Sequence, residues 1–171
     1  FLNILESLNY LSESDIAKSV IDDLAADTDY DVTIKKTIGL NSYNPRNQTI
    51  KHLVNFGLEV KDQNGDWGIQ SPAVGLLHEL GHAKEHRDII REFGKGSKEE
   101  KRFMKRNHQE ALPEEERIVS EIETPAAKEL NERLNVNEGT RESYKENGSD
   151  ILVTGPTSTT PKRKVMLKDK D

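Results

Sequence analysis

The sequence predicts an α+β fold, in which a small, mostly antiparallel sheet lies over a long helix and a further helix follows downstream. Three observations support this prediction. Apolar residues recur at helical spacing up to residue 24, polar and apolar residues alternate in short stretches between residues 30 and 69, and serine- or threonine-proline pairs begin helices at residues 71 and 124. The chain has 171 residues, of which 33% are hydrophobic and 33% charged, so it can bury one modest core.

The N-terminal part is predicted to be helical. Apolar residues from Phe1 to Leu8 lie at helical spacing, and Ser12 or Ser14 can cap a second helix that runs to Leu24.

Short strands are predicted next, and residues 41–47 have the composition of a loop. The segments with strand-like alternation are 30–35, 48–55 and 58–61. Asn64-Gly65 favours a tight type I′ turn that leads into another strand at 67–69. Trp67, the only tryptophan, is expected to be a core residue.

Composition also bounds the domain organisation and the function classes. Residues 1–147 are predicted to form one domain, and residues 148–171, rich in Gly, Pro, Ser, Thr and Lys, a flexible tail or linker. The chain begins Phe-Leu-Asn, without Met, so we expect a fragment of a longer protein. The absence of cysteine excludes disulfides and thiol catalysis, the net charge of -6 argues against a nucleic-acid partner, and no apolar run is long enough for a membrane span.

The segment with the clearest chemical signature is a helix predicted from Ser71 to about Gly94, with serine as N-cap and proline as the first helical residue. It contains an HExxH motif formed by His78, Glu79 and His82. Residues four apart share one helical face, so both imidazoles can reach a single metal ion. The neighbouring carboxylate can take a proton from a zinc-bound water as that water attacks a carbonyl. The motif therefore predicts a catalytic zinc site.

A third protein ligand is expected from a helix predicted at residues 113–123. Ile118, Val119 and Ile122 define an apolar stripe on that helix, and Glu115 projects near the centre of the stripe. A carboxylate among aliphatic side chains needs a partner, and a divalent cation is a strong one. Glu115 is therefore the predicted third ligand.

Alternatives to Glu115 remain open. The other glutamates of this segment project off the stripe, as on a solvated face: Glu114, Glu116, Glu121 and Glu123. Of these, Glu116 and Glu123 are the fallback ligands. Asp88 lies at the last position of an HExxHxxGxxD pattern, but Glu85 occupies the place of the glycine that would end the helix, which weakens that route.

Three blocks of the sequence, 71–83, 114–119 and 139–144, resemble the NleD-type effector zinc metallopeptidases, and the similarity covers about residues 15–146. Related domains occur at the C-termini of polymorphic bacterial toxins. The resemblance implies a zincin-like metalloprotease fold, one Zn²⁺ held in a gluzincin-like manner, and cleavage of a protein inside a target cell. In zincins an edge strand above the metal pairs with the extended substrate, and residues 48–55 or 58–62 could form that edge.

Arg141 and Tyr144 are candidate catalytic residues. Attack on a peptide carbonyl creates an oxyanion, which cationic or hydroxyl donors can stabilise. Clostridial neurotoxin proteases resemble this chain here, since they carry an Arg-x-x-Tyr pair in that role.

The predicted function is that of a zinc-dependent endopeptidase, the toxin or effector domain of a bacterial protein that is secreted or injected and acts in the target-cell cytoplasm. Its partners would be a protein substrate and a cognate immunity or delivery protein. The alternative is a catalytically inactive zincin-like binding module with a structural zinc; Glu79 favours the enzyme, because a structural site has no use for that carboxylate.

Overall fold

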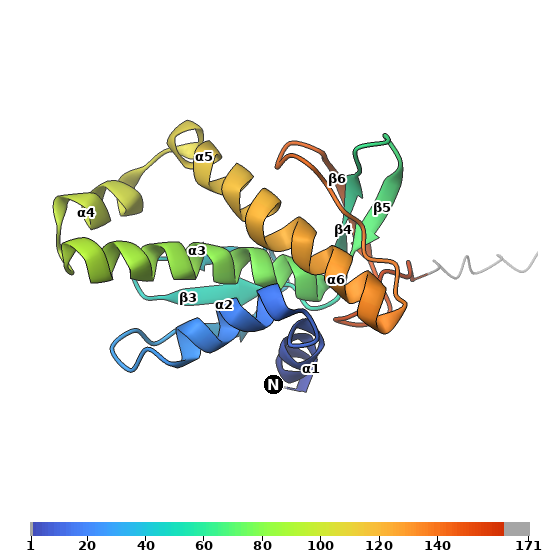
Figure 1. Ribbon diagram of the computed structural model, residues 1–171, viewed down its shortest axis with the longest axis horizontal. Helices are drawn as coiled ribbons and strands as arrows, with labels where there is room; N and C mark the ends of the chain where they lie inside the picture. The colour runs from blue at the N-terminus through green and yellow to red at the C-terminus, as the bar shows by residue number, and fades with distance from the viewer. Residues whose placement is uncertain (1, 163–171) are drawn as a thin grey trace, which may run out of the picture.

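Helix α3, Pro72–Phe93, crosses the middle of the molecule in the computed structural model, which describes residues 2–162 (Figure 1). Helix α4 lies at its C-terminal end, and the strands β4, β5 and β6 lie near its N-terminal end. The remaining elements surround α3. They are α1 (Leu2–Leu11), α2 (Asp15–Ala25), β1 (Thr33–Lys36), β2 (Ser42–Asn44), β3 (Thr49–His52), β4 (Phe56–Lys61), β5 (Trp67–Gln70), α4 (Lys98–Lys105), α5 (His108–Ile118), the π-helical turn η1 (Val119–Glu123), α6 (Thr124–Leu134) and β6 (Asn147–Leu152).

The strands form two three-stranded sheets, so the α+β class is confirmed with two sheets in place of one. The first has the order β1-β3-β2, with β1 parallel and β2 antiparallel to β3. The second has the order β5-β4-β6 and is antiparallel throughout. Both strands predicted as substrate edges, 48–55 and 58–62, contain central strands, which have neighbours on both sides. That prediction is wrong, because a central strand has no free edge to offer.

The core lies where α1, α2 and the inner face of the first sheet pack against α3. Leu76, Leu77 and Leu80 of α3 are buried there, together with Ile50 of β3 and Leu130 of α6. Ser71 caps α3 by accepting a hydrogen bond from the Val74 amide, and Gly94 ends the helix at φ 88°, as predicted.

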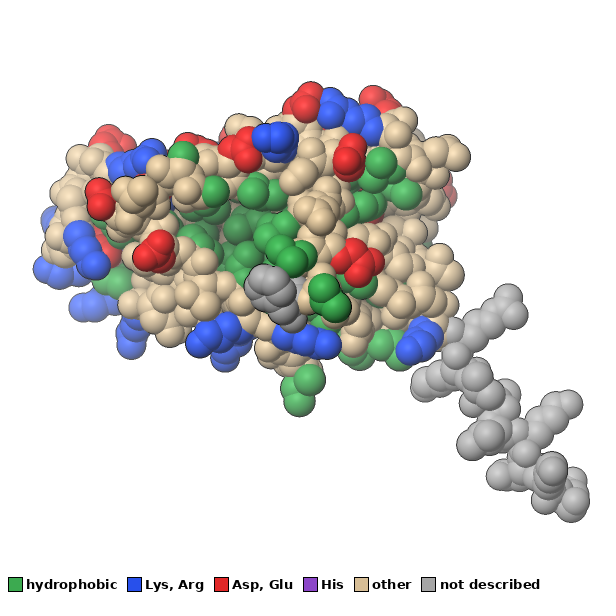
Figure 2. Space-filling model, turned by 90° about the horizontal axis from the view of Figure 1, so that it is seen from below, with side chains coloured by type: hydrophobic (Ala, Val, Ile, Leu, Met, Phe, Trp, Pro, Cys, Tyr) green, Lys and Arg blue, Asp and Glu red, His purple; other side chains and the backbone are tan. Residues whose placement is uncertain are grey.

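The face that carries α1 and α2 shows hydrophobic side chains gathered in its middle, with Lys and Arg side chains along one edge (Figure 2). Between α1, α2 and β1 lies an apolar hollow of about 240 Å³, into which Leu80 of α3 also reaches. This side of α3 is therefore apolar, and the polar residues of the HExxH motif lie on a different side of the helix. Within residues 2–162, no helix is both long and apolar enough to cross a membrane.

Helices α5 and α6 follow one another through η1 with no break. The prediction that a helix begins at Pro113 is wrong, because α5 begins five residues earlier, at His108. Asn107 accepts a hydrogen bond from the Glu110 amide and the Glu110 carboxylate accepts one from the Asn107 amide, a capping box that defines the start. Pro113 lies inside the helix.

Other local predictions are corrected by the structure. Residues 42–44 of the predicted loop form the edge strand β2. Residues 148–152 of the predicted tail belong to β6, and residues 163–171 lie outside the described part of the chain. The hairpin at Asn64-Gly65 is confirmed, but its turn is not type I′, since of the two residues only Gly65 has a positive φ. Trp67 is 60% exposed on β5 and is not a core residue.

Candidate metal centre

Two histidines of α3 and one glutamate of α5 converge in the structure. His78 and His82 lie one turn apart, and each offers its Nε2 atom towards the same oxygen of Glu115, at 2.9 and 3.3 Å. One ligand atom from each of the three residues lies within 4.8 Å of the others, so the group could hold a metal ion. Two imidazole nitrogens and a carboxylate oxygen are a donor set that suits zinc. The predicted grouping of His78, His82 and Glu115 is therefore present.

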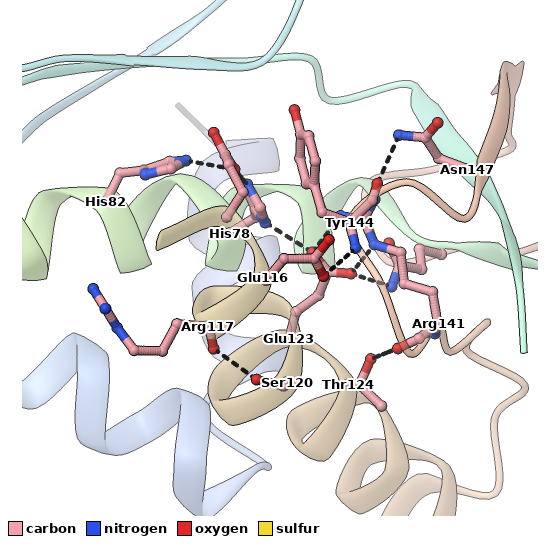
Figure 3. A network of polar contacts seen from close by, with 12 residues as sticks. His78, His82, Glu116, Arg117, Ser120, Glu123, Thr124, Arg141, Tyr144 and Asn147 are labelled. Carbon is pink, nitrogen blue, oxygen red and sulfur yellow. Dashed lines mark hydrogen bonds and ion pairs between the residues drawn. The ribbon is translucent and has the colours of Figure 1, made fainter. Parts of the chain in front are cut away.

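The second nitrogen of each imidazole faces another buried carboxylate. His78 Nδ1 lies 2.8 Å from Glu123 Oε2, and His82 Nδ1 lies 2.6 Å from Glu114 Oε1 (Figure 3 shows the His78 side). An ionised carboxylate can only accept a hydrogen bond, so each Nδ1 atom carries a proton and donates a hydrogen bond to its carboxylate. Such partners orient the rings and leave Nε2 as the atom that meets a metal.

These carboxylates also control the charge of the imidazoles. Burial lowers the pKa of His78, but its hydrogen bonds with Glu115 and Glu123 outweigh burial and raise that pKa to about 9. For His82, burial is likewise outweighed by Glu114 and Glu115, and the pKa rises to about 10. A metal ion must therefore displace a proton from each Nε2.

Glu79 lies beside the two histidines and faces a cleft of about 390 Å³. Only 8% of Glu79 is exposed, and burial raises the pKa of its carboxyl group. Ser42 and Tyr43 of the edge strand β2 line the same cleft, as do residues of α4 and α5. The HExxH carboxylate is thus set at the point where a bound molecule could meet the histidines.

Arg141 and Tyr144 reach the centre from the segment before β6. The Arg141 guanidinium is buried and donates through Nε and Nη2 to Glu123, at 2.6 and 2.7 Å. Its Nη1 donates to the Tyr144 carbonyl at 3.1 Å. The Tyr144 ring stacks on His78 with centroids 5.9 Å apart, and burial raises the pKa of its hydroxyl, which stays protonated (Figure 3). Arg141 therefore links Glu123 to the Tyr144 backbone.

The alternative ligands have other partners. Glu116 accepts hydrogen bonds from the Ser143 hydroxyl at 3.0 Å and from the Tyr144 amide at 2.9 Å. Asp88 pairs with Lys84 and Arg87. Glu123 is hydrogen-bonded to His78 Nδ1 and to Arg141. It therefore holds the His78 ring in place and is not part of the group that could hold the metal.

Sequence reasoning missed the roles of Glu114 and Glu123, which were expected on a solvated face. They are 4% and 1% exposed. The projection assumed one regular helix through Glu123, but η1 is a π-helical turn, which changes the phase of the residues after Ile118. Glu114 is held by Arg106 as well as by His82, a contact that depends on how α4 folds back. The π turn and the position of α4 gave no local signal.

Comparison with protein-family models, with curated proteins and with solved structures finds no match to this chain. The assignment of a candidate metal centre therefore rests on its own geometry: three convergent donors, two carboxylates behind them, and an open cleft in front.

We expect the protein to bind one zinc ion with these ligands. His82→Ala and Glu115→Ala should each weaken zinc affinity by more than about 100-fold, because each removes a direct ligand. Asp88→Ala and Glu121→Ala should leave it unchanged, since Asp88 pairs elsewhere and Glu121 is exposed. Competition titration with a chromophoric chelator measures all four; loss of zinc in Asp88→Ala with retention in Glu115→Ala would show that the assignment of the third ligand is wrong.

Zinc binding should release about two protons at pH 7, one from each imidazole, because both imidazole pKa values lie above that pH. Affinity should accordingly rise with pH up to about 10, where the second of the two imidazoles has lost its proton. Calorimetry of zinc binding in buffers of different ionisation enthalpy counts the protons released. A heat that is independent of the buffer would contradict the protonation assigned to the two histidines.

Glu123→Gln should lower zinc affinity by about 10- to 100-fold, since it weakens the acceptor that orients His78 and removes the charge that Arg141 balances. Glu121→Gln, two residues away and exposed, is the matched control and should have no effect. The same chelator competition measures both, and Glu114→Gln repeats the test at His82. Equal affinities for all four proteins, wild type included, would exclude a role for these carboxylates.

Proposed function

We propose that this protein is a zinc-dependent endopeptidase, in which His78, His82 and Glu115 hold the metal ion and Glu79 is the general base. The observation that carries the proposal is the position of Glu79: a buried carboxyl group beside both imidazoles, at the wall of an open cleft. Burial raises the pKa of this carboxyl group, and a more basic carboxylate is a better proton acceptor.

The open cleft favours an enzyme over a structural site. Structural zinc sites are closed by four protein ligands, whereas catalytic sites keep one position free for water or substrate. Among the described residues, three ligand groups converge here, and the cleft of about 390 Å³ gives access to them. The inactive binding module with a structural zinc remains the competing function, and turnover separates the two.

The roles of the side chains follow from their places. Zinc, when bound, lowers the pKa of a coordinated water and polarises a carbonyl. Glu79 accepts the proton of the attacking water and returns it to the leaving amine. Tyr144, protonated and lining the same cleft, donates a hydrogen bond to the developing oxyanion. Arg141 acts as a positioning residue, because its guanidinium is bound to Glu123 and to the Tyr144 carbonyl.

Strand β2 is the edge at which an extended substrate would pair. It is the outermost strand of the first sheet on this side, and Ser42 and Tyr43 line the cleft next to Glu79. Backbone pairing along β2 would hold a peptide across the centre while side-chain pockets select its sequence.

The biological setting is proposed on the resemblance to NleD-type metallopeptidases alone. On that basis the protein is the toxin or effector domain of a secreted or injected bacterial protein, its substrate is a protein in the target-cell cytoplasm, and a cognate immunity or delivery protein is its partner.

Glu79→Gln should keep one zinc ion and lower turnover by about 100- to 10,000-fold, because an amide cannot accept the proton of water. Glu92→Gln, at an exposed position of the same helix, is the control and should cleave normally. Mass spectrometry of a peptide library gives the rates, and metal analysis gives the zinc content. A zinc-loaded wild type that cleaves nothing would favour the binding module, and equal rates in Glu79→Gln would exclude Glu79 as the base.

A further inference from the structure

A second cleft, of about 240 Å³, opens on the other side of the candidate metal centre. It shares Asn41, His78, Glu79 and Tyr144 with the first cleft, so the two meet at the centre. A peptide laid across the centre would place residues on the two sides of its scissile bond into different clefts.

Four apolar side chains, Leu40, Leu53, Phe56 and Leu58, line part of the second cleft, and polar residues line the rest. Phe56 and Leu58 come from alternate positions of β4 and therefore lie on one face of that strand, and Leu53 precedes them. Leu40, in the loop between β1 and β2, also lines the cleft and is 74% exposed. A large apolar side chain that is so exposed beside a cleft contributes favourable free energy when a ligand covers it and removes its apolar surface from water.

The charged groups of this cleft narrow the choice of ligand further. Arg141 and Glu123 neutralise each other at its buried end. Asp150, the cross-strand neighbour of Leu58, and Glu79 are carboxylates at its exposed end and at the centre. Both would repel an acidic side chain, and burying one there without a partner is costly.

The first cleft has a different character. Asn41, Ser42, Asn107 and His108 line it, and so does Arg106, next to Phe103 and Met104. Pro45 and Ala111 also line the first cleft, but a larger part of its exposed lining is polar, so the second cleft is the more apolar of the two.

We propose that the second cleft is a specificity subsite for one large apolar side chain (Leu, Ile, Met or Phe) of a peptide, next to the scissile bond. The proposal rests on the proposed endopeptidase function and adds the substrate class. A volume of about 240 Å³ is below the range of roughly 300–1,000 Å³ typical of sites for whole small-molecule ligands, and so fits a single side chain.

Peptidyl hydroxamates test the subsite through binding, without turnover. Two series carry Leu, Ala, Asp or Lys directly before or directly after the zinc-chelating hydroxamate, and calorimetry on the zinc-loaded protein gives each Kd. In one series the Leu probe should bind at least about 10-fold more tightly than the Ala and Asp probes, because it buries more apolar surface. Binding of all probes within about twofold, or tightest binding of the Asp or Lys probe, would overturn the proposal.

A matched pair of variants locates the effect. Leu40→Asp alters the wall of the cleft, whereas Ile38→Asp changes a fully exposed residue of the same loop that does not line it; neither side chain contributes to the core. Leu40→Asp should reduce the preference for Leu over Ala to within about threefold, and Ile38→Asp should keep it. Equal preferences in the two variants would contradict the assignment of this wall.

The outcomes separate the subsite from the function on which it rests. If the protein binds zinc and the Ala probe but does not distinguish Leu, only the subsite is wrong. If it binds neither zinc nor any probe, the proposed metal centre itself fails, and the subsite with it. Cleavage of a peptide library should show the same apolar preference beside the cut bond.

Discussion

The hydrogen bonds between two buried imidazoles and the carboxylates behind them are the interaction on which the rest of the centre depends. His78 and His82 occupy an α3 packed against a sheet and other helices, where unpartnered polar groups are costly. Glu123 accepts a hydrogen bond from His78 Nδ1, and Glu114 accepts one from His82 Nδ1. These bonds orient both rings so that their Nε2 atoms point at Glu115. Each carboxylate is in turn paired with an arginine, Arg141 and Arg106 respectively, so the end of α4, the continuous helix α5–η1 and the segment before β6 are all held to one pair of rings.

This arrangement explains how a protein with a modest core can keep an open site. The apolar residues of α3 pack against the N-terminal helices and the first sheet, and its polar residues line two clefts. The clefts are walled by short or edge elements: β2, the loop before it, the α4–α5 connection, and β6 beside β4. The rigid helix therefore carries the reacting groups, and the less regular segments around it define what can reach them.

Local spacing was sufficient for much of the centre. The HExxH motif and the cap at Ser71 depend on contacts within a few residues, and the structure has both. Glu115 also joins the group, as the projected stripe indicated, although η1 changes the phase of the stripe residues after Ile118. The roles of Glu114 and Glu123 depend on a π turn and on α4, which no short pattern reveals. Strands β2 and β6 were missed for a related reason: each is stabilised by pairing with a distant strand, and their own sequences are polar or rich in turn residues.

The central claim is that one zinc ion binds between α3 and α5 through the Nε2 atoms of His78 and His82. A crystal structure of the zinc-loaded protein, with anomalous diffraction recorded on both sides of the zinc absorption edge, tests this most directly. The account predicts a single strong peak bonded to His78 Nε2, His82 Nε2 and a Glu115 oxygen, with Glu114 and Glu123 still on the Nδ1 atoms. A peak bonded to Nδ1, to Asp88 or to surface residues, or no peak at all, would contradict it.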